Sequence, residues 1–216
     1  MQAASGALLS PQVLSEIRVH GFLLWTSFGL LMPIGTLIIR VPLAEDRQRW
    51  LGSIFPVHAS LQIVSAVLAT VAAVLSIKNF DNSFNNYHQR IGIALYGLVW
   101  LQGLVGILRP LRGCKERRLW FALHWALGTV LSLLGVINIY TGLLAYRGKT
   151  SRRINLWLVL FTAEISSVVI FYLIQDKWPY IRQQGAISCR HEPVTLVKVD
   201  PSSRSLPDDK PKEAPV

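Results

Sequence analysis

Long uncharged runs alternate with short polar, mostly cationic stretches along most of this 216-residue chain. Five apolar runs each approach or exceed the roughly 20 residues that cross a bilayer as a helix. They are His20–Ile39, a segment within Leu51–Ile77, Ile91–Leu108, a segment within Leu119–Tyr146, and Ile154–Gln175. Because every backbone group of a span must be hydrogen-bonded internally, the pattern predicts an all-α membrane protein with five transmembrane helices.

The same pattern predicts three regions. Residues 1–19 form an N-terminal segment, residues 20–175 a transmembrane domain, and residues 176–216 a polar, Pro-rich cytoplasmic tail for which we predict disorder. Pro33 is expected to kink the first span, and Pro56 either to kink the second span or to mark its first turn.

The formal net charge of +10 comes from cations that lie between the apolar runs and in the tails. We call the side on which the chain starts X and the opposite side Y. The Y loops carry Arg40, Arg47, Arg49, Arg109, Arg112, Lys115, Arg117 and Arg118, and the X side carries Arg18, Lys78, Arg90, Arg147, Lys149, Arg152 and Arg153. The bias predicts a cytoplasmic Y side, with an extracytoplasmic N-terminus and a cytoplasmic C-terminus, although the cluster at 147–153 opposes it. No basic helix stands apart from the spans, so we predict no nucleic-acid partner.

Four of the five histidines fall one to each of the first four spans: His20, His58, His88 and His124. Spans one and three run from X to Y, so His20 and His88 lie at similar depth near X. Spans two and four run the other way, which sets His58 and His124 a turn or more inside the Y ends. The histidines therefore form two pairs of matched depth.

A single intramembrane histidine can simply bond a neighbouring carbonyl, but four in matched pairs favour a function, because ionisable groups are costly in lipid. In an up-and-down four-helix bundle, spans one and three lie diagonally, as do spans two and four, across about 11–14 Å. Two imidazoles facing across that gap leave room for one iron in a flat macrocycle. They do not close a four-ligand zinc site, because each end offers only two histidines. The sequence thus indicates haem.

Other residues allow two interpretations. Arg90 is either a partner of a haem propionate or an interface charge, and Glu164 is either part of a proton relay or a hydrogen-bonded carboxyl. Gln62, Gln102 and Asn138 favour hydrogen bonds between helices. Four tryptophans at span ends are typical of interface anchors: Trp50, Trp120, Trp157 and Trp178. Glycines along the same spans suit close helix packing or room for a macrocycle: Gly29, Gly35, Gly92, Gly97, Gly103, Gly106, Gly128 and Gly135.

The motifs that carry the histidines resemble the transmembrane core of the cytochrome b561 family. They are "HGFLLWTSFGLLMPIGTLIIR" from His20, "VHASLQ" around His58, "YHQRIG" around His88, and "HWALGTVLSLLGVINIYTGL" from His124. The resemblance covers about Val19 to Gln175 and is strongest to the plant form in which this core follows a DOMON domain. It implies two haem b groups, held by His20 with His88 and by His58 with His124. It also implies an ascorbate-dependent transmembrane oxidoreductase of the ferric reductase type.

The resemblance also implies that electrons pass across the membrane from cytosolic ascorbate to an extracytoplasmic acceptor. Monodehydroascorbate, a ferric chelate and a quinone are the acceptors considered. Ascorbate is an anion, and a cationic rim on the Y face would concentrate it. We predict that rim at Arg40, Arg109, Arg112 and Lys115, although the positive-inside bias explains the same cations.

No DOMON domain precedes the first span, so we expect a truncated or split member or a short isoform. The partners considered, besides membrane lipid, are a DOMON-type protein and a second copy in a homodimer. The alternative function is a structural or transporter-like protein whose histidines only bond between helices.

Overall fold

The computed structural model describes residues 10–40, 47–80, 83–111 and 113–188. The first span is one continuous helical rod of α1 (Pro11–Leu24), the π-helical segment η1 (Trp25–Leu31) and α2 (Met32–Arg40). The others are α3 (Arg47–Asn79), α4 (Tyr87–Ile107), α5 (Glu116–Thr150) and α6 (Asn155–Ser188). Five of these rods are long and apolar enough to cross a membrane, which confirms the predicted fold class.

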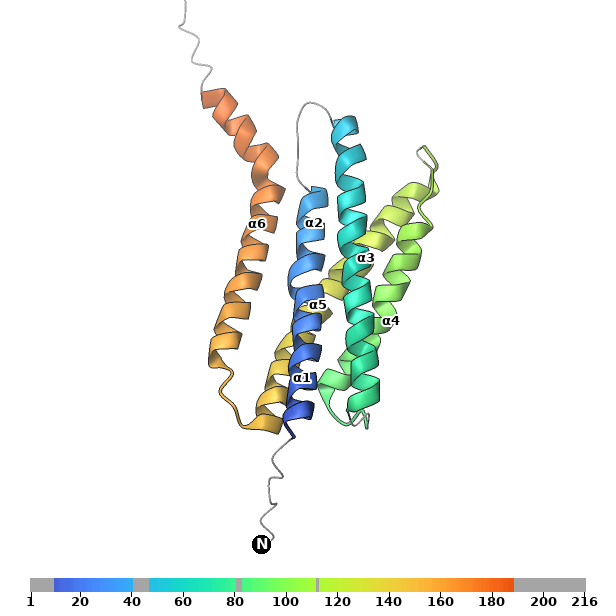
Figure 1. The fold of residues 1–216 in the computed structure, drawn as a ribbon. Helices are drawn as coiled ribbons and strands as arrows, with labels where there is room; N and C mark the ends of the chain where they lie inside the picture. The colour runs from blue at the N-terminus through green and yellow to red at the C-terminus, as the bar shows by residue number, and fades with distance from the viewer. Residues whose placement is uncertain (1–9, 41–46, 81–82, 112, 189–216) are drawn as a thin grey trace, which may run out of the picture. The chain divides into compact units, whose positions relative to one another are not determined.

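The chain divides into two compact units, Met1–Pro179 and Tyr180–Val216. The first unit holds all five spans. Within it, α3 packs along the first span, and α4 packs along α5. Helix α3 also contacts α4, and α5 contacts the first span, so these four spans form a closed ring (Figure 1). The buried core lies inside this ring and is made of Phe28, Met32, Ala69, Leu95, Val99 and Leu131. Large apolar side chains also cover the outer surface, as a lipid-facing surface requires.

The helix ends follow local signals in the sequence. Ser10 begins α1, where its hydroxyl accepts a hydrogen bond from the Val13 N–H at 3.3 Å and Pro11 takes the first helical position. Asn86 begins α4, and its side chain accepts from the Gln89 N–H at 2.9 Å. Ser151 ends α5 with a left-handed φ of 53°.

The π-helical segment ends at Leu31, two residues before Pro33, whose ring nitrogen cannot donate a hydrogen bond to the preceding turn. Side chains of α3 bond the backbone of this widened region. The Ser65 hydroxyl donates to the Ser27 carbonyl at 2.9 Å, and the Ser27 hydroxyl donates to the Ser65 carbonyl at 2.8 Å. Gln62 donates to the Met32 carbonyl at 3.2 Å. Ser27 and Ser65 are fully buried, so these reciprocal bonds join the first two spans in the middle of the bundle.

We expect Ser65→Ala to lower the free energy of unfolding by about 1 kcal/mol, since interhelical hydrogen bonds within membranes average about 0.6 kcal/mol each. Ser167→Ala is the matched control, because the Ser167 hydroxyl bonds only the Ala163 carbonyl of its own helix. Unfolding of both variants in mixed detergent micelles measures the difference. Equal stabilities would show that the serine pair does not hold the two spans together.

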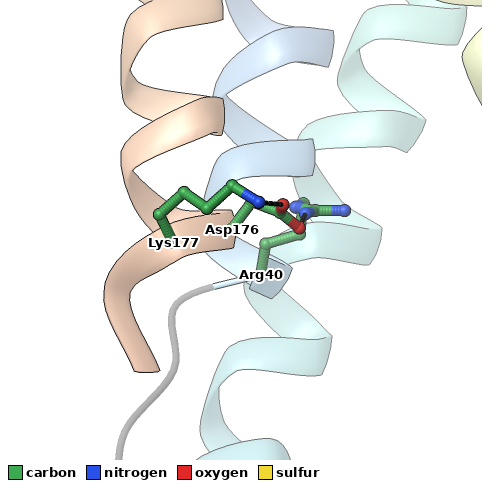
Figure 2. Close-up of polar contacts among 3 residues, drawn as sticks. All are labelled: Arg40, Asp176 and Lys177. Atoms are coloured by element: carbon green, nitrogen blue, oxygen red, sulfur yellow. Dashed lines mark hydrogen bonds and ion pairs between the residues drawn. The ribbon is translucent and has the colours of Figure 1, made fainter. Parts of the chain in front are cut away.

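Polar contacts fasten α6 to the first span. The Trp25 indole donates to the Glu164 carboxyl at 2.8 Å, and Gln175 donates to the Leu37 carbonyl at 3.0 Å. Arg40 pairs with Asp176 at 3.3 Å, and Asp176 also lies 3.9 Å from Lys177 (Figure 2). Glu164 is thus hydrogen-bonded between helices, which favours the structural interpretation of this carboxyl.

The helix bounds differ from the prediction in three places. Helix α1 begins at Pro11, so part of the predicted N-terminal segment is helical. Pro56 lies inside α3 rather than in its first turn. Helix α6 continues past Gln175 to Ser188, so the predicted tail starts within a helix, because apolar residues such as Trp178 and Ile181 extend the helical pattern. Residues 189–216 lie outside the described residues, and the disorder predicted for them stays a prediction.

Candidate functional site

The ring of helices sets spans one and three on one diagonal and spans two and four on the other, as predicted from the sequence. Each diagonal carries one pair of histidines. All four histidines are partly buried, and three of them bond a backbone carbonyl of another helix. The bundle therefore brings the predicted pairs together from segments far apart in the sequence.

The first pair lies near the X ends of α1 and α4. The imidazole rings of His20 and His88 have centroids 6.2 Å apart and planes at 88° to each other. The His20 Nδ1 donates to the Ala72 carbonyl of α3 at 2.9 Å, and the His88 Nδ1 donates to the Asn138 carbonyl of α5 at 3.1 Å. Since a carbonyl only accepts, Nδ1 carries the proton in both rings, and Nε2 keeps its lone pair for a ligand bond.

The second pair lies toward the Y ends of α3 and α5. The His58 Nδ1 donates to the Gly35 carbonyl of α2 at 2.8 Å, the same kind of Nδ1–H···O=C bond as in the first pair. His124 lies within electrostatic range of His58 and of Arg109. Its Nε2 is 3.4 Å from the side-chain nitrogen of Gln102 on α4, and that amide donates to the His124 carbonyl at 2.9 Å. His124 is therefore held by contacts that differ from those of the other three histidines.

The two pairs form two layers at a nearly constant separation. Each of the four spans in the ring contributes a histidine or a residue bonded to one to both layers, and on the first span His20 and Gly35 are 15 residues apart. On α3 His58 and Ala72 are 14 residues apart, on α4 His88 and Gln102 are 14 apart, and on α5 His124 and Asn138 are 14 apart. At about 1.5 Å of rise per residue the layers are about 21 Å apart along the helices.

Small residues line the rings. A Cβ placed on Gly142 would lie 2.9 Å from the Cε1 of His88, so only glycine leaves this ring its position. A Cβ on Gly106 would lie 3.7 Å from the Cε1 of His124, in ordinary contact. Gly97 and Gly103, which the sequence placed with the packing glycines, have no atom near their missing Cβ. Gly142 was not among the glycines predicted from the sequence, although it continues the seven-residue spacing of Gly128 and Gly135.

The cations predicted as site residues differ in their exposure and in their contacts. Arg90 is exposed, and its Nε donates to the Phe84 carbonyl at 2.9 Å in the loop before α4. Arg40 stacks over the Tyr172 ring at 3.9 Å besides pairing with Asp176. Lys115 is exposed at the start of α5, whereas Arg112 lies outside the described residues.

Further residues near the histidines make contacts that the structure defines. Trp120, predicted to be an interface anchor, stacks its ring on His124, with centroids 5.3 Å apart and planes 11° from parallel. Gln62, Gln102 and Asn138 all bond between helices, as predicted, and Asn138 of α5 does so with His88 of α4. A tryptophan four residues before a histidine on one helix was the signal that could have identified the stack.

Comparison with known proteins decides the family. The family model described as eukaryotic cytochrome b561 matches residues 19–147, more than half of the chain. This chain belongs to the cytochrome b561 family. It is therefore a multi-pass membrane oxidoreductase that binds b-type haem and transfers electrons across the membrane.

Three relatives show the breadth of the match. A cytochrome b561 domain-containing protein of Arabidopsis thaliana is 50% identical over 181 residues, covering 83% of this chain and 70% of the relative. A cytochrome b561 and DOMON domain-containing protein of the same plant is 30% identical over 149 residues, 66% of this chain and 36% of the relative. A Xenopus laevis protein named "Putative ferric-chelate reductase 1" is 26% identical over 132 residues, 59% of this chain and 22% of the relative. No solved structure matches.

The first histidine pair of this b561 protein fits a haem. Metal–imidazole bonds are about 2 Å long, so two imidazoles that held one iron between them would keep their ring centres roughly 6 Å apart, which is the spacing of His20 and His88. Nδ1–H···O=C bonds orient such ligands and raise their basicity. In the second pair, His58 makes the same kind of Nδ1–H···O=C bond. Ligation by His124 would replace the contact between the His124 Nε2 and Gln102. Over the described residues no group of three His, Cys, Asp or Glu side chains is arranged to hold a metal ion.

Proposed function

We propose that this protein holds two b-type haems, one between His20 and His88 and one between His58 and His124, and passes electrons from ascorbate on the Y side to an acceptor on the X side. The observation that supports this most is the pair of histidine layers, about 21 Å apart along the helices. Bound haem supplies a one-electron carrier. The residues of the chain orient the imidazoles, keep Nε2 unprotonated and exclude water through the apolar core between the layers.

The ratio of haem to chain in the purified protein tests this proposal. Two haems per chain are expected, with a b-type α-band that appears on addition of ascorbate. A protein that carries no haem would support the alternative, a structural or transporter-like bundle in which the imidazole–carbonyl bonds only join helices. One haem per chain would contradict the second site.

The donor site is proposed on the Y face, at the loop that joins α4 to α5. Arg109 lies at the end of α4 with its guanidinium 4.5 Å from the centre of the Phe55 ring, and Lys115 is exposed at the other end of the loop. Arg112 lies between them in the sequence. Arg40 adds less free charge to this rim, because Asp176 pairs with it.

We expect the double variant Arg112→Gln with Lys115→Gln to raise the apparent KM for ascorbate by roughly three- to tenfold at low salt, since the local cations that concentrate the anion are lost. The difference should shrink as salt rises, because exposed charges are screened within about 8–10 Å. Lys149→Gln with Arg152→Gln, on the X side, is the matched control and should leave this KM unchanged. An unaltered rate in the first variant at low salt would move the donor site elsewhere.

The acceptor site is proposed on the X face, where Arg147, Lys149 and Arg152 lie around the end of α5. Monodehydroascorbate, ferric chelates and a quinone are the acceptors considered, and the name of the Xenopus relative supports a ferric chelate. Arg90 stays a candidate partner for a propionate of the X-side haem. The DOMON domains of several relatives support a DOMON-type partner on this extracytoplasmic face. The loop charges support an extracytoplasmic N-terminus and a cytoplasmic C-terminus.

A further inference from the structure

His124 is held unlike the other three histidines. His20, His58 and His88 each donate from Nδ1 to a backbone carbonyl of another helix. The Nδ1 of His124 is buried, and no hydrogen-bond partner reaches it among the described residues. A ring without that bond needs another contact to fix its orientation, since the hydrogen bond is what normally sets the plane of a ligating imidazole.

Trp120 supplies such a contact. It lies four residues before His124 on α5, so the two side chains project from the same face of the helix one turn apart. Their rings stack with centroids 5.3 Å apart and planes 11° from parallel. This stack covers one face of the imidazole and opposes rotation of the ring.

The indole is itself fixed in place from two other elements. Its Nε1 donates to the Val105 carbonyl of α4 at 2.6 Å. The Arg109 guanidinium lies 5.6 Å from the indole centre and 4.5 Å from the Phe55 ring of α3. Helix α4 and the Y-side loop therefore hold Trp120 beside His124, and Phe55 of α3 contacts the arginine of that loop.

We propose that Trp120 is the positioning residue of His124, and that ring stacking does for this ligand what an Nδ1–H···O=C bond does for the other three. The proposal rests on the proposed function, since it takes His124 as the ligand of the Y-side haem. Substitution of Trp120 is therefore expected to affect the Y-side haem and to leave the X-side haem unchanged.

Trp120→Leu and Trp120→Phe test this assignment. Leucine removes the aromatic surface, and loss of a group that orients a metal ligand typically costs 10–100-fold in affinity. We expect haem transfer to excess apomyoglobin to become about tenfold faster or more for one haem of the two in Trp120→Leu. The EPR gmax of that haem should also shift, because gmax of a bis-imidazole ferric haem reports the angle between the two imidazole planes. Phenylalanine keeps a stacking ring, so Trp120→Phe should stay close to wild type in both measurements.

Trp100→Leu is the matched control, because Trp100 is 56% exposed on the outer face of α4 and contacts Tyr96 rather than a histidine. Unchanged gmax values and transfer rates in Trp120→Leu would overturn the positioning role. So would equal effects on both haems, or an effect in Trp120→Phe as large as in Trp120→Leu. Failure of the proposed function itself is distinguishable, because it appears in the wild-type protein as fewer than two haems before any substitution is made.

Discussion

His88→Ala should leave a folded protein with one haem per chain instead of two. The substitution removes the imidazole that faces His20 at 6.2 Å, while the second layer, about 21 Å away along the helices, keeps both its histidines. The Asn138 carbonyl that loses its histidine still accepts from the Thr141 hydroxyl at 3.0 Å, so little strain is expected in α5. The haem-to-chain ratio by the pyridine haemochrome assay measures the loss.

Two companion variants sharpen this test. His20→Ala should lose the same haem, identified by the same missing EPR signal, because both rings belong to one layer. His191→Ala, which changes the histidine outside the spans, should keep both haems. Different signals lost in His20→Ala and His88→Ala would refute the pairing, and loss of both haems from a folded His88→Ala protein would refute two independent sites.

Gly142→Val should remove or weaken the same haem without touching a ligand. Its Cβ would lie 2.9 Å from Cε1 of His88, closer than real Cβ atoms approach, and 3.2 Å from Nδ1, tighter than most real Cβ contacts. The ring must therefore move, and its Nδ1 bond to Asn138 at 3.1 Å must lengthen. Overpacking of this kind costs about 1–3 kcal/mol, and disturbing the orientation of a ligand costs about 10–100-fold in affinity.

Gly148→Val on the same helix is the control, because no atom lies near the Cβ position of Gly148. Haem retention after dilution and the EPR spectrum of the His20–His88 site measure both variants. If Gly142→Val kept a wild-type spectrum, the close approach between Gly142 and His88 would have no role in holding the ring.

The sequence predicted the five spans well because lipid imposes a long, uncharged run on every transmembrane helix. It also predicted that His20 and His88 would lie together, since an up-and-down bundle fixes depth and diagonal from chain order alone. Both predictions depend on coarse properties, namely length, charge and direction, that do not require side-chain orientation.

Details that depend on orientation were not predicted. Trp120 lies at a span end, where tryptophan usually faces the interface, and only its rotation about α5 reveals the stack on His124. The π-helical turn at Trp25–Leu31 follows from Pro33 together with hydrogen bonds from another helix, and a single segment's pattern does not show these. The end of α6 was predicted too early because charged residues from Asp176 onward resemble a tail, although Arg40 pairs with one of them.

Electron transfer across a sealed bilayer tests the central claim most directly. Purified protein is reconstituted into vesicles that enclose a ferric chelate, and ascorbate is added on the side that carries the C-terminus. The account predicts reduction of the enclosed chelate in wild type at a rate far above that of empty vesicles, with loss of this rate in His88→Ala. A wild-type protein whose haems are reduced by ascorbate while the enclosed chelate stays oxidised would contradict the claim that the two histidine layers carry electrons from one face to the other.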